Sequence, residues 1–462
     1  MYGRTRRIHL IGIGGSGMSG IAEVLLNMGY QVSGSDLKAS EVTDRIVRLG
    51  GRVFIGHAAS NVEGAQVVVF SSAVTSENPE LLAANAAAVP VIGRADMLAE
   101  LMRTKYGIAV GGAHGKTTTT SMIAAVLARG GLDPTIVVGG RLHALGSNAR
   151  LGHGPFMVAE ADESDGSFLR LAPALAVITN IDLEHVDHYG SLEEIRHAFV
   201  YFANRVPFYG VTVLCADDPE VRGILASVRK RTLLYGTAEG ADVRAEDIRL
   251  RADGSRFRVI AHGRVQGEIE LHQPGHHNVL NALAAVAVGL EVEVGFGHVA
   301  EALVAFVGVS RRFELRGEAA GVRVVDDYAH HPTEIRATLT AAAARSGRRL
   351  VVFQPHRYSR TQSLAEEFGT AFEQADLVWV LDVYGAGEKP IEGVSGKVVA
   401  DSARRHGAMH VRYVPELETV AAEVAAEARA GDTVMTLGAG DVWKLGETIL
   451  DRLRSSGVKV ER

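Results

Sequence analysis

Two glycine-rich turns in this sequence have the composition of sites for phosphate groups. The first, Gly12-Ile13-Gly14-Gly15-Ser16-Gly17, follows an apolar run at 8–11, and Asp36 stands just after the next strand candidate, at 31–35. Glycines let the backbone approach a diphosphate, and the N-terminus of the following helix attracts its negative charge. With an acidic residue about 20 positions further on, the pattern is typical of dinucleotide binding, although any nucleoside diphosphate satisfies the same chemistry. A tight turn without a ligand is the structural alternative.

The second turn reads Gly111-Gly112-Ala113-His114-Gly115-Lys116-Thr117-Thr118, again between a strand-length apolar run and a helix-length stretch. It departs from the usual phosphate-loop spacing, which would need glycine where Val110 stands. The core Gly115-Lys116-Thr117 is intact. It predicts that backbone N–H groups and the Lys116 amine bind nucleotide phosphates, and that the Thr117 hydroxyl binds Mg²⁺. A capped helix start with an exposed lysine is the alternative.

Two further strand ends offer metal ligands. The apolar run at 157–159 leads into Glu160-Ala161-Asp162-Glu163-Ser164-Asp165, and the run at 176–179 leads into a segment that contains His185 and His188. Carboxylates suit Mg²⁺ or Mn²⁺ bridging to substrate phosphates, so we expect this cation beside the second turn. Solvated acidic loops are the structural alternative. A zinc site on the two histidines is disfavoured, because no cysteine ligand is available and carboxylates are many.

Polar groups also stand at the start of a later helix and at two C-terminal strand ends. Asn278 and Asn281 are three residues apart and share a helix face, so they form a candidate adenine clamp, although Asn278 could equally cap that helix. Arginines suit carboxylate and phosphate recognition, with surface salt bridging as the alternative. The C-terminal groups are Arg311-Arg312, the run from Asp326 to Pro332, and His356-Arg357-Tyr358-Ser359-Arg360.

The elements that must position these residues belong to the α/β class, because apolar runs of strand length alternate with longer, Ala-rich, helix-periodic stretches. Three segments, 1–102, 103–310 and 311–462, each repeat this pattern, and the more polar insert at 243–272 is predicted to be antiparallel. The runs are mostly continuously apolar, as in strands covered on both faces. The predicted strands are 8–11, 31–35, 67–70, 107–110, 157–159, 176–179, 211–214, 322–325, 350–353, 377–381 and 433–437.

Composition narrows the class of protein. The 462 residues carry 48 Lys plus Arg against 54 Asp plus Glu, a formal charge of -6, which argues against nucleic-acid binding across the whole surface. Cys215 is the one cysteine, so an intrachain disulfide is excluded. No uncharged apolar run reaches the roughly 18 residues of a membrane span, and the arginine-bearing start breaks into glycines too early for a signal peptide. We therefore expect a cytoplasmic protein without membrane insertion.

Taken together, these motifs resemble the Mur ligase family along essentially the whole chain, and most closely its alanine-adding branch. Several siblings carry a modified lysine near the metal, whereas residues 186–205 here contain no lysine. The resemblance implies a Rossmann-like N-terminal domain (1–102) for UDP-N-acetylmuramate, a central P-loop ATPase-type domain (103–310) for ATP with Mg²⁺ or Mn²⁺, and a Rossmann-like C-terminal domain (311–462) that closes over both. It also implies ligation of L-alanine to the lactyl carboxylate through an acyl phosphate, in peptidoglycan precursor synthesis.

The resemblance also assigns roles to residues of this sequence, and leaves the general base unassigned. The shortened phosphate loop is usual in the family, and the first glycine turn is reassigned to the UDP diphosphate. The catalytic residues implied are Lys116, Glu160, His185, Arg357 and Arg360. Those implied for the metal are Thr117, Glu160 and His185. Those implied for ATP are Gly112, His114, Gly115, Lys116, Thr117, Thr118, His277, Asn278, Asn281, Arg312, Asp327 and His330. Those implied for the UDP-sugar are Gly14, Gly15, Ser16, Gly17, Asp36, His57 and Ser71.

Two alternative functions stay open at this point. A recycling ligase on the same scaffold would attach a whole tripeptide to UDP-N-acetylmuramate in place of L-alanine. A nicotinamide-dependent oxidoreductase would use the first glycine turn with Asp36, but it leaves Lys116 and Thr117 without a role. The oligomeric state and the strictness of the acceptor choice are not determined by the sequence.

Overall fold

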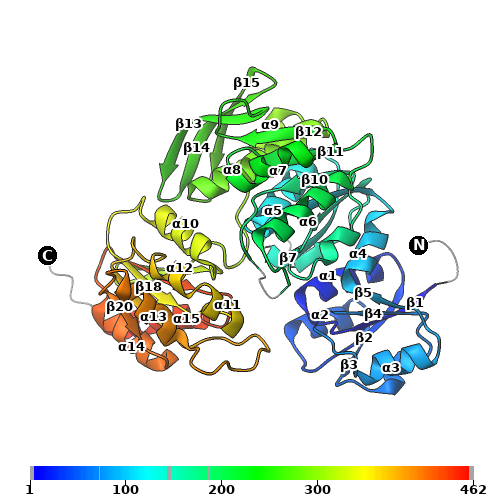
Figure 1. Cartoon of the computed structure of the whole chain (residues 1–462), viewed down its shortest axis with the longest axis horizontal. Coiled ribbons are helices and arrows are strands. Elements are labelled where there is room, and N and C mark those ends of the chain that lie inside the picture. The colour runs from blue at the N-terminus through cyan, green and yellow to red at the C-terminus, as the bar shows by residue number, and fades with distance from the viewer. Residues whose placement is uncertain (1–4, 72, 143–146, 185–187, 457–462) are drawn as a thin grey trace.

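The structure is a computed structural model that describes residues 5–456 except 72, 143–146 and 185–187. It has three α/β lobes, each built around a sheet made from one continuous stretch of chain. The N-terminal and C-terminal lobes lie on opposite sides below the middle lobe (Figure 1). The predicted α/β class is confirmed. Among the described residues, no helix combines the length and apolar character needed to cross a bilayer.

The N-terminal lobe has a fully parallel five-stranded sheet in the order β3-β2-β1-β4-β5. The strand order reverses direction between β1 and β4, which is where such sheets open a crevice for ligands. The first glycine turn lies at this point. The strands are β1 (Arg7–Ile11), β2 (Gln31–Asp36), β3 (Arg52–Ile55), β4 (Val67–Phe70) and β5 (Val91–Gly93), and the helices are α1 (Ser16–Asn27), α2 (Glu41–Arg48), α3 (Pro79–Ala86) and α4 (Arg94–Met102).

The middle lobe has ten strands in the order β15-β14-β13-β12-β11-β10-β6-β9-β7-β8. The helix α8 is buried along most of its length, and it packs with α5 against the sheet in one apolar core. The strands are β6 (Tyr106–Gly111), β7 (Thr135–Leu142), β8 (Ser147–Arg150), β9 (Phe156–Glu160), β10 (Leu175–Ile178), β11 (Val211–Cys215) and β12 (Thr232–Gly236). The helices are α5 (Lys116–Arg129), α6 (Leu192–Asn204), α7 (Pro219–Ile224), α8 (His276–Glu291) and α9 (Phe296–Val304).

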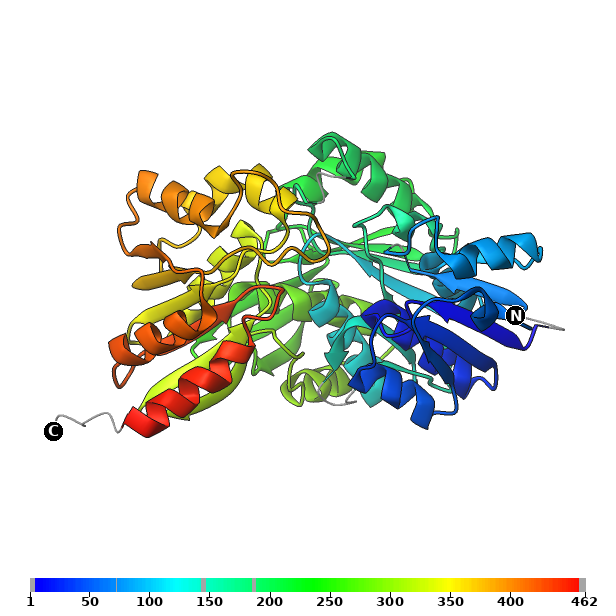
Figure 2. The ribbon, with the colours of Figure 1, turned by 90° about the horizontal axis from the view of Figure 1, so that it is seen from below.

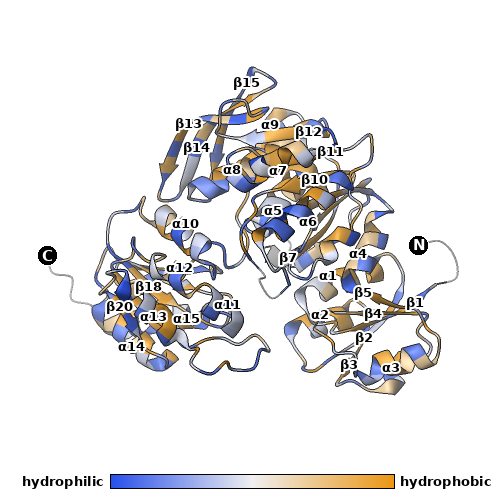
Figure 3. Ribbon diagram, in the orientation of Figure 1, coloured by the Kyte–Doolittle hydropathy of each residue, from blue (hydrophilic) through white to orange (hydrophobic). Residues whose placement is uncertain are grey.

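The polar insert forms the outer part of this middle sheet. As predicted, it is antiparallel, and consists of β13 (Val243–Arg251), β14 (Gly254–Ala261) and β15 (Arg264–Leu271). Its residues alternate between buried and solvent-facing positions, because only one face is covered. Figure 3 shows the difference, since β13 and β14 are partly hydrophilic whereas the inner strands are mainly hydrophobic.

The C-terminal lobe has six strands in the order β16-β17-β21-β18-β19-β20, and only the edge strand β16 is antiparallel. Figure 2 shows the last helix, α15, along this sheet beside β16 and β17. The strands are β16 (Glu314–Ala319), β17 (Val322–Asp327), β18 (Arg349–Phe353), β19 (Leu377–Val380), β20 (Val411–Tyr413) and β21 (Thr433–Leu437). The helices are α10 (Pro332–Ala342), α11 (Tyr358–Ser363), α12 (Ala365–Gly369), α13 (Gly396–Arg405), α14 (Leu417–Glu427) and α15 (Lys444–Ser456).

The predicted strands are all present, but several of their ends differ from the prediction. Glu160 is the last residue of β9, and Asp326 and Asp327 are the last residues of β17, whereas the sequence predicts that these carboxylates follow the strands. They stay in the sheet because their backbone groups pair with neighbouring strands while their side chains reach polar partners. The sequence does not predict the edge strands β3, β5 and β20, which have only three or four residues each.

Candidate active site

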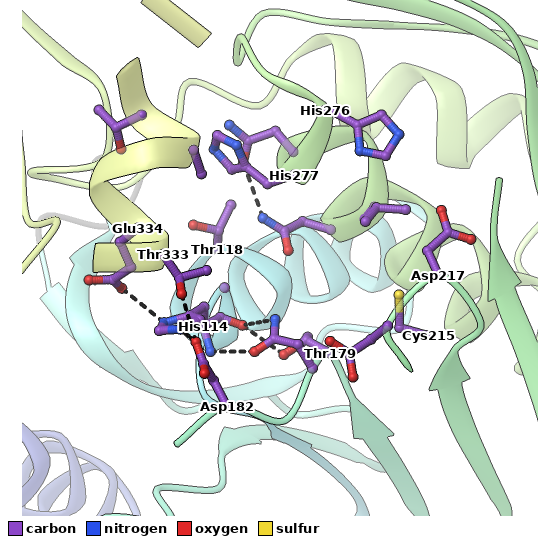
Figure 4. A pocket seen from close by; sticks show the side chains of 18 of the residues that line it. His114, Thr118, Thr179, Asp182, Cys215, Asp217, His276, His277, Thr333 and Glu334 are labelled. Carbon is purple, nitrogen blue, oxygen red and sulfur yellow. Dashed lines mark hydrogen bonds and ion pairs between the residues drawn. The ribbon is translucent and has the colours of Figure 1, made fainter. Parts of the chain in front are cut away.

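A pocket of about 590 Å³ lies between the middle and C-terminal lobes. Figure 4 shows His114 of the second turn facing Glu334 of α10, with His276 and His277 of α8 on the far side. The carboxylate Asp327 and the guanidinium of Arg312 also line it. The pocket is therefore bounded by the second glycine turn, by the start of α8 and by the first residues of the C-terminal lobe.

A second pocket, of about 760 Å³, lies where all three lobes meet. Gly115, Arg312 and Glu334 line both pockets, so the two are parts of one continuous site. The second pocket gathers residues that are far apart in the sequence. Its polar lining includes Ser16 and Ser71 of the N-terminal lobe, Lys116, Thr117 and Glu160 of the middle lobe, and His330, Arg357 and Arg360 of the C-terminal lobe.

The amine of Lys116 is fixed at the start of α5. It donates hydrogen bonds to the carbonyls of Gly112 and Ala113, at 2.7 and 3.0 Å, and to Glu163 at 2.9 Å. Burial by itself lowers the pKa of Lys116, but the carboxylates of Glu163 and Asp162 outweigh it and raise the pKa above the ordinary value. The lysine is therefore a permanent positive charge in the three-lobe pocket, next in the chain to Gly115, which lines both pockets.

The carboxylate of Glu160 lines the same pocket as Lys116 and is held from two sides. It accepts hydrogen bonds from the Thr117 hydroxyl and from the backbone N–H of Gly139. A hydroxyl and a carboxylate oxygen that already touch are the type of ligand pair that Mg²⁺ takes from a protein when phosphates supply further ligands. The predicted third ligand, His185, lies outside the described residues.

The first glycine turn is held by the end of β2. The carbonyl of Ser35 accepts from the N–H groups of Gly12 and Ile13, and the Asp36 carboxylate accepts from the N–H of Gly14 at 2.8 Å. Gly15, Ser16 and Gly17 line the three-lobe pocket, whereas Gly14 and Asp36 do not. Asp36, the acidic residue of the dinucleotide-binding pattern, therefore supports the turn in this structure.

Arg94, at the start of α4, was missed by sequence reasoning. It lines the three-lobe pocket, and a Cβ added to Gly17 would lie 3.0 Å from its Cδ atom. Its guanidinium is 3.8 Å from Asp162, which joins the N-terminal lobe to the middle one. No motif surrounds it, and only the folding of β5 brings it to the turn.

His114 joins the middle lobe to the C-terminal lobe. Its Nε2 is 3.0 Å from Asp182 and its Nδ1 is 3.4 Å from Glu334, while the Thr333 hydroxyl donates to Asp182 at 2.8 Å. Burial would lower the pKa of His114, but Asp182 and Glu334 raise it to about 10. The imidazole is therefore protonated at neutral pH. The sequence places Asp182 among the candidate metal ligands after the 176–179 strand and does not predict its contact with His114. Thr333 and Glu334 were missed, although both follow Pro332 in the pattern of a helix start.

The two asparagines of α8 bond to each other and to α5. Asn281 donates to Asn278 at 3.1 Å and accepts from Thr119 at 3.1 Å, and Asn278 donates to the carbonyl of Pro274 at 2.8 Å. Both line the pocket between the lobes, together with Thr118. The helix begins at His276, after Gly275. The alternative in which Asn278 caps the helix is therefore wrong.

Three imidazoles that line these pockets are neutral at pH 7. Desolvation lowers the pKa of His277 and that of His330 to about 4, and the pKa of His356 to about 3. Burial raises the pKa of Asp327 to about 6, although Arg312 and two backbone N–H groups oppose the rise.

Arg311 and Asp326, the residues next to Arg312 and Asp327 in the chain, support the C-terminal lobe. They form a 2.9 Å salt bridge, and Arg311 also donates hydrogen bonds to the carbonyls of Gly438 and Gly440.

The two predicted catalytic arginines line the three-lobe pocket together. Arg357 donates to Glu388 at 2.6 Å, and Arg360 lies 3.3 Å from the ring nitrogen of His356. Glu388 was not anticipated, because it stands in a loop with no recognisable pattern. His57, which is predicted for the UDP-sugar, does not line this pocket. Its Nδ1 atom lies 3.0 Å from the Ser35 hydroxyl, near the end of β2.

Comparisons with known proteins agree with this architecture. Residues 7–106 match the Mur ligase family catalytic domain, residues 110–289 the Mur ligase middle domain, and residues 311–440 the Mur ligase glutamate ligase domain. The UDP-N-acetylmuramate--L-alanine ligase of Geobacter sp. (strain M21) is 56% identical over 99% of this chain and 99% of that protein. The chain belongs to the Mur ligase family.

Solved structures extend the likeness to the fold. The crystal structure of the UDP-N-acetylmuramate-alanine ligase MurC from Thermotoga maritima has a TM-score of 0.81 at 31% identity, covering 97% of this chain and 99% of that one. A murein peptide ligase from Psychrobacter arcticus has a TM-score of 0.72 at 24% identity, covering 97% and 99%. The second likeness is one of fold alone.

Proposed function

We propose that this protein ligates L-alanine to the lactyl carboxylate of UDP-N-acetylmuramate, using ATP and releasing ADP and phosphate. One observation carries the proposal: the pocket where the three lobes meet brings the first glycine turn, Lys116 and Arg360 to one space. The 56% identity to a protein named for this reaction supports the choice of substrates. The reaction belongs to peptidoglycan precursor synthesis.

The second glycine turn is the ATP site in this proposal. The backbone N–H groups of the turn and the Lys116 amine bind the β- and γ-phosphates, and the adenosine end occupies the 590 Å³ pocket. The amides of Asn278 and Asn281, and the neutral ring of His277, line that pocket and are suited to a base. Arg312 and Asp327 approach from the C-terminal lobe.

The donor set fits a hard divalent cation. Thr117 and Glu160 would hold Mg²⁺, with His185 as the third protein ligand implied by the family, and Mn²⁺ suits the same oxygen atoms. When bound, the cation neutralises charge on the phosphates and on the reacting carboxylate. The chain itself supplies Lys116, whose charge is present at any pH near neutrality.

The chemistry follows from charge. A carboxylate oxygen of the substrate attacks the γ-phosphorus, and the bond to the β,γ-bridging oxygen breaks, giving an acyl phosphate and ADP. The amine of L-alanine then attacks the acyl carbon, phosphate leaves, and the nitrogen loses a proton as the amide forms. Because two anions meet in the first step, Lys116, Arg357 and Arg360 are the groups that lower its barrier. Arg357 and Arg360 also suit the carboxylate of the incoming amino acid.

An ADP-release assay that crosses UDP-N-acetylmuramate with a panel of amino acids tests the proposal. We expect release with L-alanine and weaker release with glycine or serine, because one methyl group contributes only about 1–3 kcal/mol of discrimination. Hydroxylamine added without L-alanine should trap a hydroxamate. ADP release without any hydroxamate would contradict the acyl phosphate.

Two alternatives are tested in the same assay. A tripeptide acceptor that supports faster turnover than L-alanine would favour the recycling ligase. Quenching or enhancement of NADH fluorescence on addition of the protein, without ATP turnover, would favour the oxidoreductase.

A further inference from the structure

A buried carboxylate, Glu80, lies beside the carboxyl ends of β2 and β3 in the N-terminal sheet and lines neither pocket. It is the second residue of α3, and its side chain is 0% exposed. Its Oε1 accepts hydrogen bonds from Asn61 Nδ2 at 2.5 Å and from the N–H of Ala58 at 3.4 Å. Its Oε2 accepts from the Ser35 hydroxyl at 2.5 Å. A charge is rarely placed in such a position without a role, because its burial is costly.

Two imidazoles complete the surroundings of Glu80. The Nδ1 atom of His57 is 3.4 Å from Oε2, and the Nε2 atom of His9 is 3.6 Å from it. Burial would raise the pKa of Glu80, but the nearby His9 ring and the hydrogen bonds from Ser35 and Asn61 lower it to about 2. Glu80 is therefore ionised at neutral pH, and both of its oxygens only accept hydrogen bonds.

This charge orders the protons of its neighbours. The Ser35 hydroxyl has one proton and donates it to Glu80, so towards the Nδ1 of His57, 3.0 Å away, Ser35 Oγ can only accept. His57 must then carry its proton on Nδ1. In a neutral imidazole the other nitrogen, Nε2, is left without a proton and is a hydrogen-bond acceptor.

The same residues hold the loops around the first glycine turn. The carbonyl of Ser35 accepts from the N–H groups of Gly12 and Ile13. Ala58 and Asn61 belong to the segment after β3, and Asn61 also donates to the carbonyl of Gly56 at 3.2 Å. Glu80 therefore connects the turn that would bind the diphosphate with the segment that carries His57.

We propose that Glu80 is a positioning residue for the nucleoside end of the substrate, and that it acts through Ser35 to fix His57 as a hydrogen-bond acceptor at Nε2. The ligand group that this nitrogen fits is an N–H donor such as the imide of uracil. The inference rests on the proposed function, which supplies a uridine nucleotide at this edge. The His57 side chain is 18% exposed, so a ligand can reach it.

The first test is the tautomer of His57 in the free protein, read from ¹⁵N shifts of histidine-labelled material at pH 8.5, with His57→Gln to identify its signals. We expect a proton on Nδ1 in the wild type. In Glu80→Gln, the amide oxygen keeps the Asn61 bond while the NH₂ group takes the place of Oε2 and donates to Ser35. The Ser35 proton then turns to Nδ1 of His57, and the ring proton moves to Nε2. A wild-type ring protonated on Nε2 overturns the proposal.

The second test is binding. A donor in place of an acceptor at Nε2 should raise the dissociation constant of UDP, measured by calorimetry, about tenfold in Glu80→Gln while the KM for ATP is unchanged. Ser35→Ala should weaken UDP binding by breaking the same relay. The matched control is Ser33→Ala on the same strand, which removes a 2.9 Å hydrogen bond to Nδ1 of His9 and leaves the contacts of Ser35 with Glu80 and with His57 in place. Equal losses in Ser33→Ala and Ser35→Ala, or a parallel rise in the KM for ATP, would show a merely structural role and overturn the proposal.

The two levels of inference fail separately. If the wild-type protein binds no UDP and ligates no amino acid, the proposed function is wrong. The His57 tautomer and its inversion in Glu80→Gln are measured without ligand, so they test the relay by itself.

Discussion

The two glycine turns are built alike but differ in charge. Each follows the first strand of its lobe, each has a glycine with positive φ (Gly12 at 79°, Gly115 at 80°), and each is held by the end of a neighbouring strand. The first turn has no cation of its own and its supporting acid, Asp36, is used by a backbone N–H. The second carries Lys116, which bonds to Glu163, and the carboxylate of Glu160 lines the same pocket. The first turn is suited to a diphosphate whose charge does not change during the reaction. The second is suited to phosphates whose charge is redistributed during phosphoryl transfer.

The sharpest test of this difference is Lys116→Ala. Because the amine faces charge that develops during phosphoryl transfer, we expect kcat to fall at least about 100-fold, from the loss of roughly 3 kcal/mol. The affinity for UDP, measured by calorimetry, should stay within about twofold, because the first turn is untouched. Lys397→Ala, which breaks an exposed pair with Asp401, is the control and should change neither quantity. Near-native turnover in Lys116→Ala would move the ATP site away from this turn.

Substitution of a predicted metal ligand should have the next largest effect. Glu160→Gln should raise the Mg²⁺ concentration for half-maximal activity by about tenfold or more, because a neutral amide is a weaker ligand than a carboxylate. Glu163→Gln is the matched variant, since Glu163 bonds to Lys116 and not to Thr117. A Mg²⁺ titration that shifts in Glu163→Gln and not in Glu160→Gln would reverse the assignment.

The matched pair Gly12→Ala and Gly115→Ala compares the turns directly. Both put a side chain at positive φ, at a cost of about 1–2 kcal/mol. A Cβ at Gly115 would also lie 2.6 Å from the Asn281 oxygen, whereas at Gly12 the nearest atom is 3.4 Å away. We expect Gly115→Ala to raise the KM for ATP, and Gly12→Ala to raise the KM for the UDP-sugar by a smaller factor. Gly29→Ala, at φ 86° with nothing within 4 Å, controls for strain alone.

The sequence was sufficient for the α/β class, the antiparallel insert and the position of both glycine turns between a strand and a helix, because each depends on local pattern. Strand interiors are continuously apolar, and glycines mark the turns. Reliance on local pattern also explains why the sequence predicts that Glu160 and Asp327 follow their strands, when they are the last strand residues. A polar side chain at a strand end resembles the first residue of a loop.

The residues that sequence reasoning missed come from segments that only tertiary packing brings together. Arg94 reaches the first turn through β5, and Glu388 reaches Arg357 from a distant loop. Glu334 contacts His114 across 220 positions of chain because α10 packs on the middle lobe. Periodicity and spacing contain no information on such contacts.

The smallest expected effect concerns this contact between the lobes. Because the pKa of His114 is raised from 6.5 to about 10, its ion pairs with Asp182 and Glu334 contribute their full stability below about pH 6.5 and lose it as the pH rises through about 10. The melting temperature of the nucleotide-free protein should therefore fall more between pH 6.5 and 10 in the wild type than in His114→Gln.

Glu334→Gln should reduce the same slope, and should raise the KM for ATP only a few-fold, since Lys116 and the second turn remain in place. His197→Gln is the control, because its histidine is 73% exposed and pairs only with Glu193 of its own helix among the contacts described. If the melting temperature changes equally with pH in the wild type and in His114→Gln, the protonated imidazole of His114 is not stabilised by its contact with the C-terminal lobe. In that case the C-terminal lobe would contact the second turn only through the bound nucleotide. Among the described residues, the first turn is held by β2 and not by the C-terminal lobe.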